Sequence, residues 1–347
     1  MSNKSEMTIL RYDEIDDWDQ FVERHPKGTV FHTSAMIRAF ATTKRHTPFA
    51  YAAFDQHSNV CAMLVACRIS TLGAWAAGFA SRSVFYAEPI YDDTQEGQAG
   101  IRRLLSMHDQ HMCRRTLFAE VRPCFSPPTE SDPLLEQNYK LLGYLNFELD
   151  LRNSEEVLFN GFDRKCRNNI RSAMSRGVTV VEADPQQHLA EFVSVVAESY
   201  AGSKVPLADK SLFKSVFREL PSPISRLFLA SYDGKVAAAA AFLAYKNRVY
   251  YWYAGARRIP GIPAMACIVW EAIKRYAQDG FELFDFAGGG WKGEEYGPGR
   301  FKAKFGGVVT DYGRYRRIYS PLSLRCAELA YQSVRGLISP TPKKCEQ

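Results

Sequence analysis

Apolar and polar residues alternate along some segments of the chain, and elsewhere apolar residues recur at every third or fourth position. Alternation predicts half-buried strands, and the longer period predicts amphipathic helices. In the first half these patterns predict strands over residues 7–12, 49–55, 60–71, 117–121 and 144–151, and helices over 16–24, 34–42, 98–113 and 132–142. The polar turn at residues 56–59 makes a hairpin of the second and third strands.

The second half repeats this order of elements. Its patterns predict helices over residues 155–175, 185–200, 209–220, 264–278 and 322–337, and strands over 178–182, 224–231, 235–244, 249–254, 281–286 and 312–319. Asp233 and Gly234 form the strongest short hairpin signal in the chain. A hairpin followed by a crossover helix in each half predicts an α/β (α+β) protein with two mixed sheets and a cleft between two domains. The expected boundary lies near Asn153, giving domains 1–152 and 153–347.

The amino-acid composition adds few constraints on the fold beyond those that the hydrophobic patterns give. The chain has 347 residues, 46% of them hydrophobic and 24% charged, which is ordinary for a globular protein with two cores. Its apolar runs are too short to span a membrane, and residues 1–6 contain no signal-peptide core. We therefore expect a cytoplasmic protein without integral membrane contact. Peripheral association with a membrane is compatible with this location. The eight cysteines form no C-x-x-C pair, which predicts reduced thiols. His108, His111 and Cys113 lack a matching second ligand cluster, so no metal is expected.

The net charge of +6 is concentrated near the C-terminus, where residues 257–347 contain 15 lysines and arginines against nine acidic residues. Such an excess is consistent with a solvated face, or with a domain that binds phosphate of tRNA, a nucleotide or a coenzyme.

The segment G-R-F-K-A-K-F-G-G at residues 299–307 is the strongest candidate site. It follows the predicted strand 281–286 and a glycine-rich loop at 288–298, which we expect to be mobile and to close on substrate. Lys302, held near Phe301 and partly shielded from water, would stabilise the negative charge that develops on a carbonyl oxygen during acyl transfer. Asp285 is expected to hold the loop through backbone N–H groups, and the alternative is that it only accepts a hydrogen bond at the end of the strand.

This C-terminal segment and the stretch at residues 159–183 resemble the FemABX-type transferases, relatives of the GNAT acetyltransferase superfamily. The segment at residues 28–40 is a weaker match to the N-terminal part of that family. The resemblance covers about residues 8–320 and implies two tandem GNAT-like acyltransferase domains. It also implies transfer of an activated acyl group, in the best known members an aminoacyl group from tRNA, to an amine.

Further site residues follow from the helix and strand patterns read with this resemblance. Arg164, Arg167 and Arg171 form a cationic stripe on one helix, predicting contact with phosphate, although a purely solvated face is the alternative. Tyr251 and Tyr253 are expected to share one face of a strand and to line an acceptor pocket. Lys204 is a candidate cation near the cleft.

Two departures from related enzymes affect the choice of substrates. The loop at residues 255–263 corresponds to the pyrophosphate-binding loop of coenzyme A enzymes, but two prolines remove N–H donors from it, which favours aminoacyl-tRNA. The tryptophan and lysine that glycopeptide-binding members carry on the N-terminal helix are absent, which argues against a UDP-linked muropeptide acceptor.

The glycines at 288–293 match G-x-G-x-x-G only formally, because no helix follows them. Read with the resemblance to FemABX-type transferases, the sequence predicts a FemABX-like N-acyltransferase that needs no cofactor besides its co-substrate. We expect aminoacyl-tRNA as donor and a cell-envelope precursor, peptide or amino sugar as acceptor. The alternatives are an acyl-CoA-dependent transferase acting on a small amine and a non-catalytic tRNA- or nucleotide-binding protein.

Overall fold

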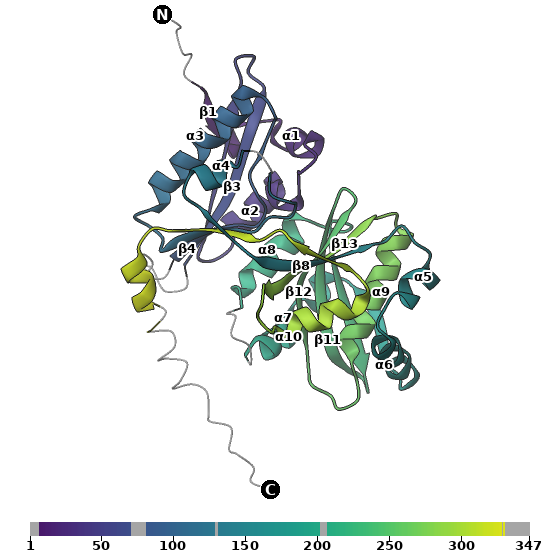
Figure 1. Ribbon diagram of the computed structural model, residues 1–347. Helices are drawn as coiled ribbons and strands as arrows, with labels where there is room; N and C mark the ends of the chain where they lie inside the picture. The colour runs from purple at the N-terminus through teal and green to yellow at the C-terminus, as the bar shows by residue number, and fades with distance from the viewer. Residues whose placement is uncertain (1–6, 71–80, 129–130, 202–206, 328, 330–347) are drawn as a thin grey trace, which may run out of the picture.

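Two mixed β-sheets with helices on both faces make up the molecule (Figure 1). The computed structural model describes residues 7–70, 81–128, 131–201, 207–327 and 329. The predicted fold class, an α/β (α+β) protein with two mixed sheets, is confirmed.

The first sheet has the strand order β1-β2-β3-β4-β6-β15-β7, with β5 paired to β3. Alternate residues of its central strands are buried on opposite faces: Leu64 packs toward α3, and Met63 and Val65 pack toward α1 and α2. The elements are β1 (Ile9–Arg11), η1 (Tyr12–Glu14), α1 (Trp18–Arg24), η2 (Val30–His32), α2 (Ser34–Ala41), β2 (His46–Phe54), β3 (Val60–Ser70), β4 (Ser81–Phe85), β5 (Ile90–Tyr91), α3 (Gln95–Met112), β6 (Phe118–Val121), α4 (Pro133–Glu136), β7 (Lys140–Leu142) and β15 (Arg314–Ile318).

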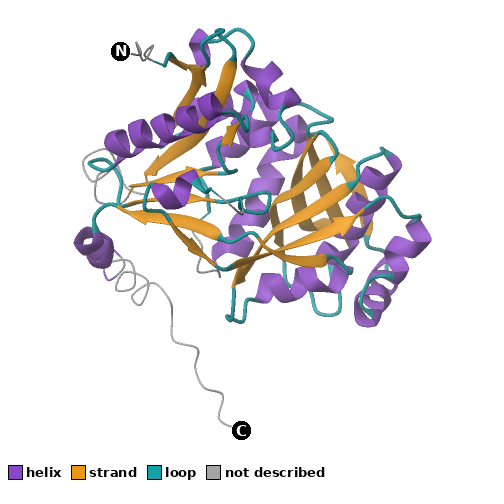
Figure 2. Cartoon of the chain, turned by 45° about the horizontal axis from the view of Figure 1, so that its top comes forward, coloured by secondary structure: helices purple, strands orange, loops and turns teal. Residues whose placement is uncertain are grey.

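The second sheet has the order β14-β8-β13-β12-β11-β10-β9. Helices α5, α6 and α9 pack on one face, and α7 and α8 pack on the other. Figure 2 shows the strands of the molecule flanked by helices. The elements are β8 (Tyr144–Asp150), α5 (Glu155–Asn160), α6 (Arg164–Ser175), β9 (Thr179–Ala183), α7 (Pro185–Ala201), α8 (Lys210–Glu219), β10 (Ser225–Tyr232), β11 (Lys235–Tyr245), β12 (Arg248–Ala256), α9 (Ala264–Gln278), β13 (Leu283–Trp291), α10 (Gly297–Lys302), η4 (Ala303–Phe305) and β14 (Val308–Asp311).

The two halves exchange strands. β8 precedes the expected boundary near Asn153 but pairs with β13 and β14 in the second sheet. β15 follows that boundary but pairs with β6 and β7 in the first sheet. In Figure 1 the C-terminal part of the chain accordingly crosses from the second sheet back to the first. Helices α2 and α8 also pack together, with Phe40 and Leu212 in one shared core. No single cut in the chain therefore separates the two sheets.

Several predicted elements differ from the structure. The helix expected over 132–142 is only the short α4, because Asn138 adopts a left-handed conformation (φ 61°) and strand β7 follows. The helix expected over 155–175 is divided into α5 and α6, since the Asp163 carboxylate caps a new helix by accepting bonds from the backbone of Lys165 and Cys166. Of the helix expected over 322–337, residues 321–327 are helical and most of the rest lies outside the described residues.

Candidate functional site

The parallel strands β12 and β13 separate after a short pairing. Their register covers Arg248 with Leu283, Val249 with Phe284, and Tyr250 with Asp285. Beyond these pairs β12 continues alongside β11, and β13 continues alongside β8. Side chains from other elements can therefore enter between the two strands.

Lys302, the last residue of α10, lies beside this separation. Its Nζ donates a hydrogen bond to the carbonyl oxygen of Gly288 on β13 at 2.8 Å. The same Nζ lies 5.7 Å from the centre of the Tyr251 ring on β12, so one ammonium group contacts both diverging strands. Only 9% of the Lys302 surface is exposed, which provides the shielding from water predicted for it.

Burial lowers the pKa of Lys302 to about 8. The negative charge of Asp285 opposes this shift, and the positive charge of Arg314 adds to it. An ammonium group with this pKa is still mostly protonated at neutral pH. Lys302 can therefore place a positive charge in a largely dry environment, where its interaction with a developing oxyanion is strong.

The glycines at 288–290 allow close packing and do not form the mobile loop that we expected. β13 runs through to Trp291 and includes them. A Cβ on Gly288 would meet the Tyr144 ring at 2.6 Å, and one on Gly289 would meet the Phe147 ring at 2.4 Å. On α10, a Cβ on Gly299 would lie 2.1 Å from the Gly289 carbonyl oxygen. These missing side chains allow α10 to lie directly against β13 and bring Lys302 to its position.

Asp285 anchors the start of the separation. Its Oδ1 accepts hydrogen bonds from Asn146 Nδ2 at 2.8 Å and from the backbone N–H of Ala287 at 2.7 Å. Its Oδ2 accepts from Arg248 Nη1 at 3.2 Å, and the same nitrogen donates to Glu148 Oε1 at 2.9 Å. Ala287 has a φ of 57°, which a non-glycine residue seldom adopts, so the carboxylate holds an unusual turn of the strand.

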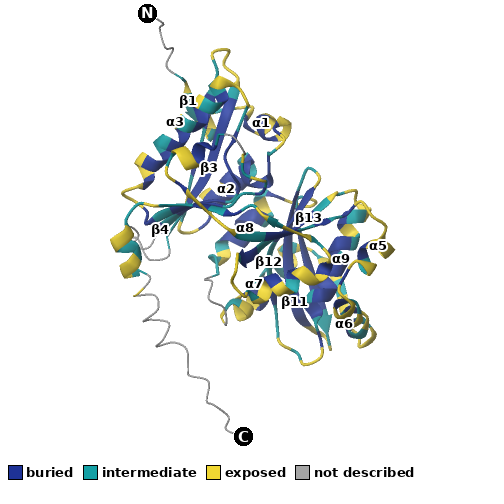
Figure 3. Ribbon diagram, viewed as in Figure 1, coloured by how far each residue is buried: buried dark blue, intermediate teal, exposed yellow. Residues whose placement is uncertain are grey.

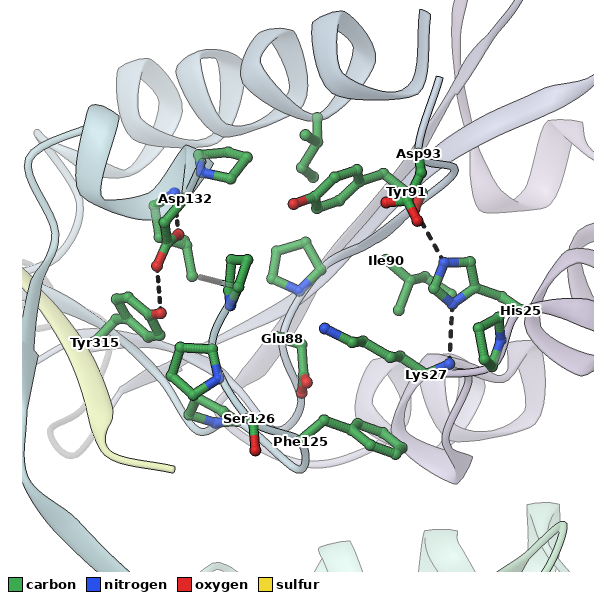
Figure 4. A pocket seen from close by; sticks show the side chains of 18 of the residues that line it. His25, Lys27, Glu88, Ile90, Tyr91, Asp93, Phe125, Ser126, Asp132 and Tyr315 are labelled. Atoms are coloured by element: carbon green, nitrogen blue, oxygen red, sulfur yellow. Dashed lines mark hydrogen bonds between the residues drawn. The ribbon is translucent and has the colours of Figure 1, made fainter. Parts of the chain in front are cut away.

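A cavity of about 300 Å³ is lined by residues from the first half of the chain and by Tyr315 of β15 (Figure 4). Glu88 lines it, is 9% exposed and accepts a hydrogen bond through Oε2 from the backbone N–H of Cys124 at 2.8 Å. Its Oε1 has no partner within the described residues. The Cys124 carbonyl accepts from Arg248 Nη1 at 2.7 Å, and the Arg248 guanidinium lies over the Phe125 ring, another lining residue. Buried contacts through Arg248 and Asp285 thus connect this cavity with the strand that carries Gly288.

The structure separates the two tyrosines that we expected to share a face. A bulge between Ala241 and Phe242 of β11 leaves Trp252 as an extra residue on β12. Tyr251 consequently packs in the core toward α9, where its hydroxyl contacts Met265, whereas Tyr253 packs toward α7 and α8. The shared-face prediction is wrong, because alternation along a strand fails at a bulge. Of the two tyrosines, Tyr251 is the one whose ring lies near the Lys302 ammonium group.

Other predicted site residues have different surroundings. Phe301 packs edge-on against Phe305, with ring centres 5.1 Å apart, which anchors α10 to the core. Arg167 donates to the carbonyl oxygens of Asn160 and Phe162 and therefore closes the end of α5.

Arg164 and Arg171 are exposed, and the Arg171 guanidinium is 5.0 Å from the centre of the Phe159 ring. Figure 3 shows that much of α6 is exposed. Lys204 lies outside the described residues.

Arg248 and Glu148 are site residues that the sequence analysis did not identify. Each is a charged residue in or beside a mainly apolar predicted strand, and this feature of the sequence could have marked them as candidate site residues. Pairing them required knowing that β8 lies next to β13, which is a long-range contact between the halves of the chain.

Residues 162–302 match the family described as "Acetyltransferase (GNAT) domain". This range contains β12, β13, α9 and Lys302. Over this range the chain is similar to GNAT acetyltransferase domains. No curated protein matches the chain.

Solved structures extend the likeness to the whole chain. FemX has a TM-score of 0.67 at 14% identity, with 94% of this chain and all of FemX covered. The C-terminal domain of a putative lysylphosphatidylglycerol synthetase from Agrobacterium fabrum gives 0.54 at 13% identity, covering 95% of this chain and 98% of that one. A tandem GNAT protein from the clavulanic acid biosynthesis pathway gives 0.53 at 13% identity, covering 91% and 99%. The chain has the tandem GNAT fold, and the resemblance to FemABX-type transferases is confirmed at that level.

Among the residues that the structure describes, no helix combines the length and apolarity that crossing a bilayer requires. Within the same ranges, no three His, Cys, Asp or Glu side chains are grouped to hold a metal ion.

Proposed function

We propose that this protein is an N-acyltransferase that forms an amide bond between an activated acyl group and an amine. The observation that carries the proposal is the buried Lys302 ammonium group, which lies beside the separating strands of a GNAT-type domain. We propose aminoacyl-tRNA as the donor and an amine on a cell-envelope precursor, peptide or amino sugar as the acceptor.

In the proposed reaction, the neutral acceptor amine attacks the carbonyl carbon of the donor ester. A C–N bond forms, and the carbonyl oxygen becomes an oxyanion that the Lys302 ammonium stabilises. When the oxyanion collapses, the C–O bond to the ribose breaks, and the proton lost by the amine is transferred to the departing ribose oxygen. Holding both substrates in one site supplies most of the remaining acceleration.

The loop before α9 supports tRNA over coenzyme A as the donor. Arg257, a candidate phosphate ligand in that loop, forms two hydrogen bonds with the Glu198 carboxylate at 2.9 and 2.8 Å. Pro260 and Pro263 supply no N–H groups, and Pro263 stands at the N-cap of α9. The loop therefore has fewer groups free to bind a pyrophosphate than a glycine-rich loop would have.

An acyl-CoA donor remains the second candidate because the matching family is described as an acetyltransferase domain. The test is to incubate the purified protein with an amine pool and either aminoacyl-tRNA or acyl-CoA, and to follow amide formation. We expect amide formation from aminoacyl-tRNA. Amide formation from acyl-CoA alone would replace the proposed donor, and consumption of neither donor would favour a non-catalytic binding protein.

A further inference from the structure

Four arginines project from one face of the first sheet around a single carboxylate. Arg82 is on β4, Glu120 is on β6, Arg122 directly follows β6, and Arg314 and Arg316 are on β15. Val84 pairs with Glu120, and Glu120 pairs with Arg316, so the alternation of strand residues places all five side chains on the same face. The opposite face of these strands packs on α3 through Phe85, Val121 and Tyr315.

Glu120 alone cannot balance this group of charges. It accepts bonds from Arg122 Nε at 2.9 Å, Arg314 Nη1 at 3.2 Å and Arg316 Nη2 at 2.9 Å. Burial raises the pKa of Glu120, but the arginines outweigh burial and lower it to about 2, so the carboxylate is ionised at all working pH values. The Nε atoms of Arg82 and Arg316 are buried and have no hydrogen-bond partner among the described residues. The group therefore retains positive charge and free donors.

Aromatic side chains from both halves of the chain surround these arginines. The Arg314 guanidinium lies 3.6 Å from the centre of the Tyr144 ring and 5.8 Å from that of Trp291, and Arg316 lies 5.6 Å from Trp291. Arg122 lies 5.4 Å from the Tyr86 ring. The face remains open to solvent, since the side chains of Arg122, Arg314 and Arg316 are 32%, 19% and 28% exposed.

The arginine face adjoins the Lys302 site through Tyr144. The Tyr144 ring lies against the Arg314 guanidinium and also packs on Gly288, whose carbonyl oxygen accepts the hydrogen bond from Lys302. Burial, reinforced by Arg122, lowers the pKa of Arg314 to about 10, which is the response expected of a cation that lacks a sufficient counter-charge. An anion bound here would supply that charge and would lie next to the group assigned to catalysis.

We infer that the arginine face, formed by Arg82, Arg122, Arg314 and Arg316 around Glu120, binds a phosphate group of a nucleotide-bearing substrate. The inference rests on the proposed function, because both candidate donors carry phosphate and adenine. Guanidinium groups form paired hydrogen bonds with phosphate oxygens, and their planes together with aromatic rings stack on nucleobases. This site is separate from the arginine stripe on α6.

Binding can be measured without turnover, using inorganic pyrophosphate, coenzyme A and deacylated tRNA as separate probes. Trp291 is an internal reporter because it lies beside Arg314 and Arg316, and a Trp291→Phe variant gives the signal of the other tryptophans. We expect at least one probe to change Trp291 fluorescence, with affinity that falls as salt rises. The probe that binds tightest identifies the source of the phosphate.

The decisive variant is Arg82→Gln, because the buried Nε of Arg82 makes no hydrogen bond to any residue that the structure describes. We expect it to weaken binding roughly tenfold and to reduce the salt slope by about one. The matched control is Arg103→Gln on the exposed side of α3, across the first sheet, and we expect it to bind like the native protein. Glu120→Gln removes the competing carboxylate and should tighten binding several-fold.

The inference is overturned if no probe binds, or if Arg82→Gln and Arg103→Gln bind alike. It is also overturned if the response to Glu120→Gln is a loss of affinity in a folded protein. Amide formation by a protein whose arginine face binds no phosphate would leave the proposed function intact and reject this inference alone.

Discussion

At the scale of single residues, Lys302 is an ammonium group kept largely away from water, which is unfavourable unless other groups compensate. Here the compensation consists of one carbonyl oxygen, an aromatic ring and the more distant Asp285. The role predicted from the sequence requires that water be partly excluded around this lysine, and the burial of Lys302 meets that condition. The sequence could not identify Gly288 or Tyr251 as its neighbours, because that required knowing how α10 packs across the sheet.

The lowered pKa of Lys302 predicts a specific pH dependence. If the protonated amine stabilises the oxyanion, its contribution is complete well below pH 8 and is lost as the pH rises through about 8. The ratio of kcat/KM between native protein and Lys302→Met should then fall above pH 8, by up to about tenfold per pH unit. Using the ratio removes the opposing effect of acceptor deprotonation, which both proteins share. A ratio that stays constant between pH 7 and 9, or that rises, would contradict the assigned role.

At the scale of elements, hydrophobic periodicity predicts where most strands and helices lie. It does not predict where a strand bulges or where a helix is interrupted. The bulge at Trp252 shifted Tyr253 to the other face, and the Asp163 cap divided one predicted helix into two. The glycines at 288–290 were assigned to a loop because glycine usually ends a strand, whereas here Tyr144 and Phe147 require the space. The bulge and the packed glycines depend on contacts between distant segments, whereas the Asp163 cap is a local interaction that hydrophobic periodicity does not reveal.

Gly299→Ala should separate α10 from β13. The new Cβ would lie 2.1 Å from the Gly289 carbonyl oxygen, so the helix has to move and Lys302 loses its contact with Gly288. We expect turnover to fall roughly tenfold or more, since misplacing a catalytic group by about 1 Å has effects of this size or larger. Gly297→Ala on the same helix is the control, because its Cβ would meet no atom within 4 Å. Equal activity of both variants would show that the position of α10 is not important for catalysis.

The α6 stripe makes a separate prediction, restricted to Arg164 and Arg171 because Arg167 closes the end of α5. Reversing both charges, Arg164→Glu with Arg171→Glu, should weaken binding of tRNA in a salt-dependent way while leaving the melting temperature nearly unchanged. Filter binding at several salt concentrations measures the first effect. The control is the double variant Arg103→Glu with Arg114→Glu, at exposed positions elsewhere. If both double variants bind equally well, the stripe is only a solvated face.

At the scale of the whole molecule, the tandem arrangement was predictable because both halves repeat one order of elements. The exchange of β8 and β15 was not, because strand pairing between distant segments leaves no periodic signal in the chain. The exchange has a functional consequence in our account. β15 brings Arg314 and Arg316 to the first sheet, and β8 brings Asn146 and Glu148 to the second, so the candidate sites depend on both halves.

This arrangement predicts the behaviour of fragments. Residues 1–152 alone lack β15, which leaves β6 and β7 without their common partner, and they carry β8 without its sheet. We expect this fragment to lack a cooperative thermal transition, and co-expression with residues 153–347 to restore one. An independently folded 1–152 fragment, with dispersed amide signals in its NMR spectrum, would instead support the predicted boundary as that of an autonomous domain.

The most direct test of the central claim compares Lys302→Met with Lys304→Met in the amide-forming assay at pH 7. Lys304 is exposed on the adjacent turn, so it shares the chemistry of Lys302 but not its burial. We predict that Lys302→Met folds normally and loses roughly a hundredfold in turnover, the usual effect of removing one oxyanion donor, whereas Lys304→Met stays close to native. Full activity in Lys302→Met, or a greater loss in Lys304→Met, would contradict the account.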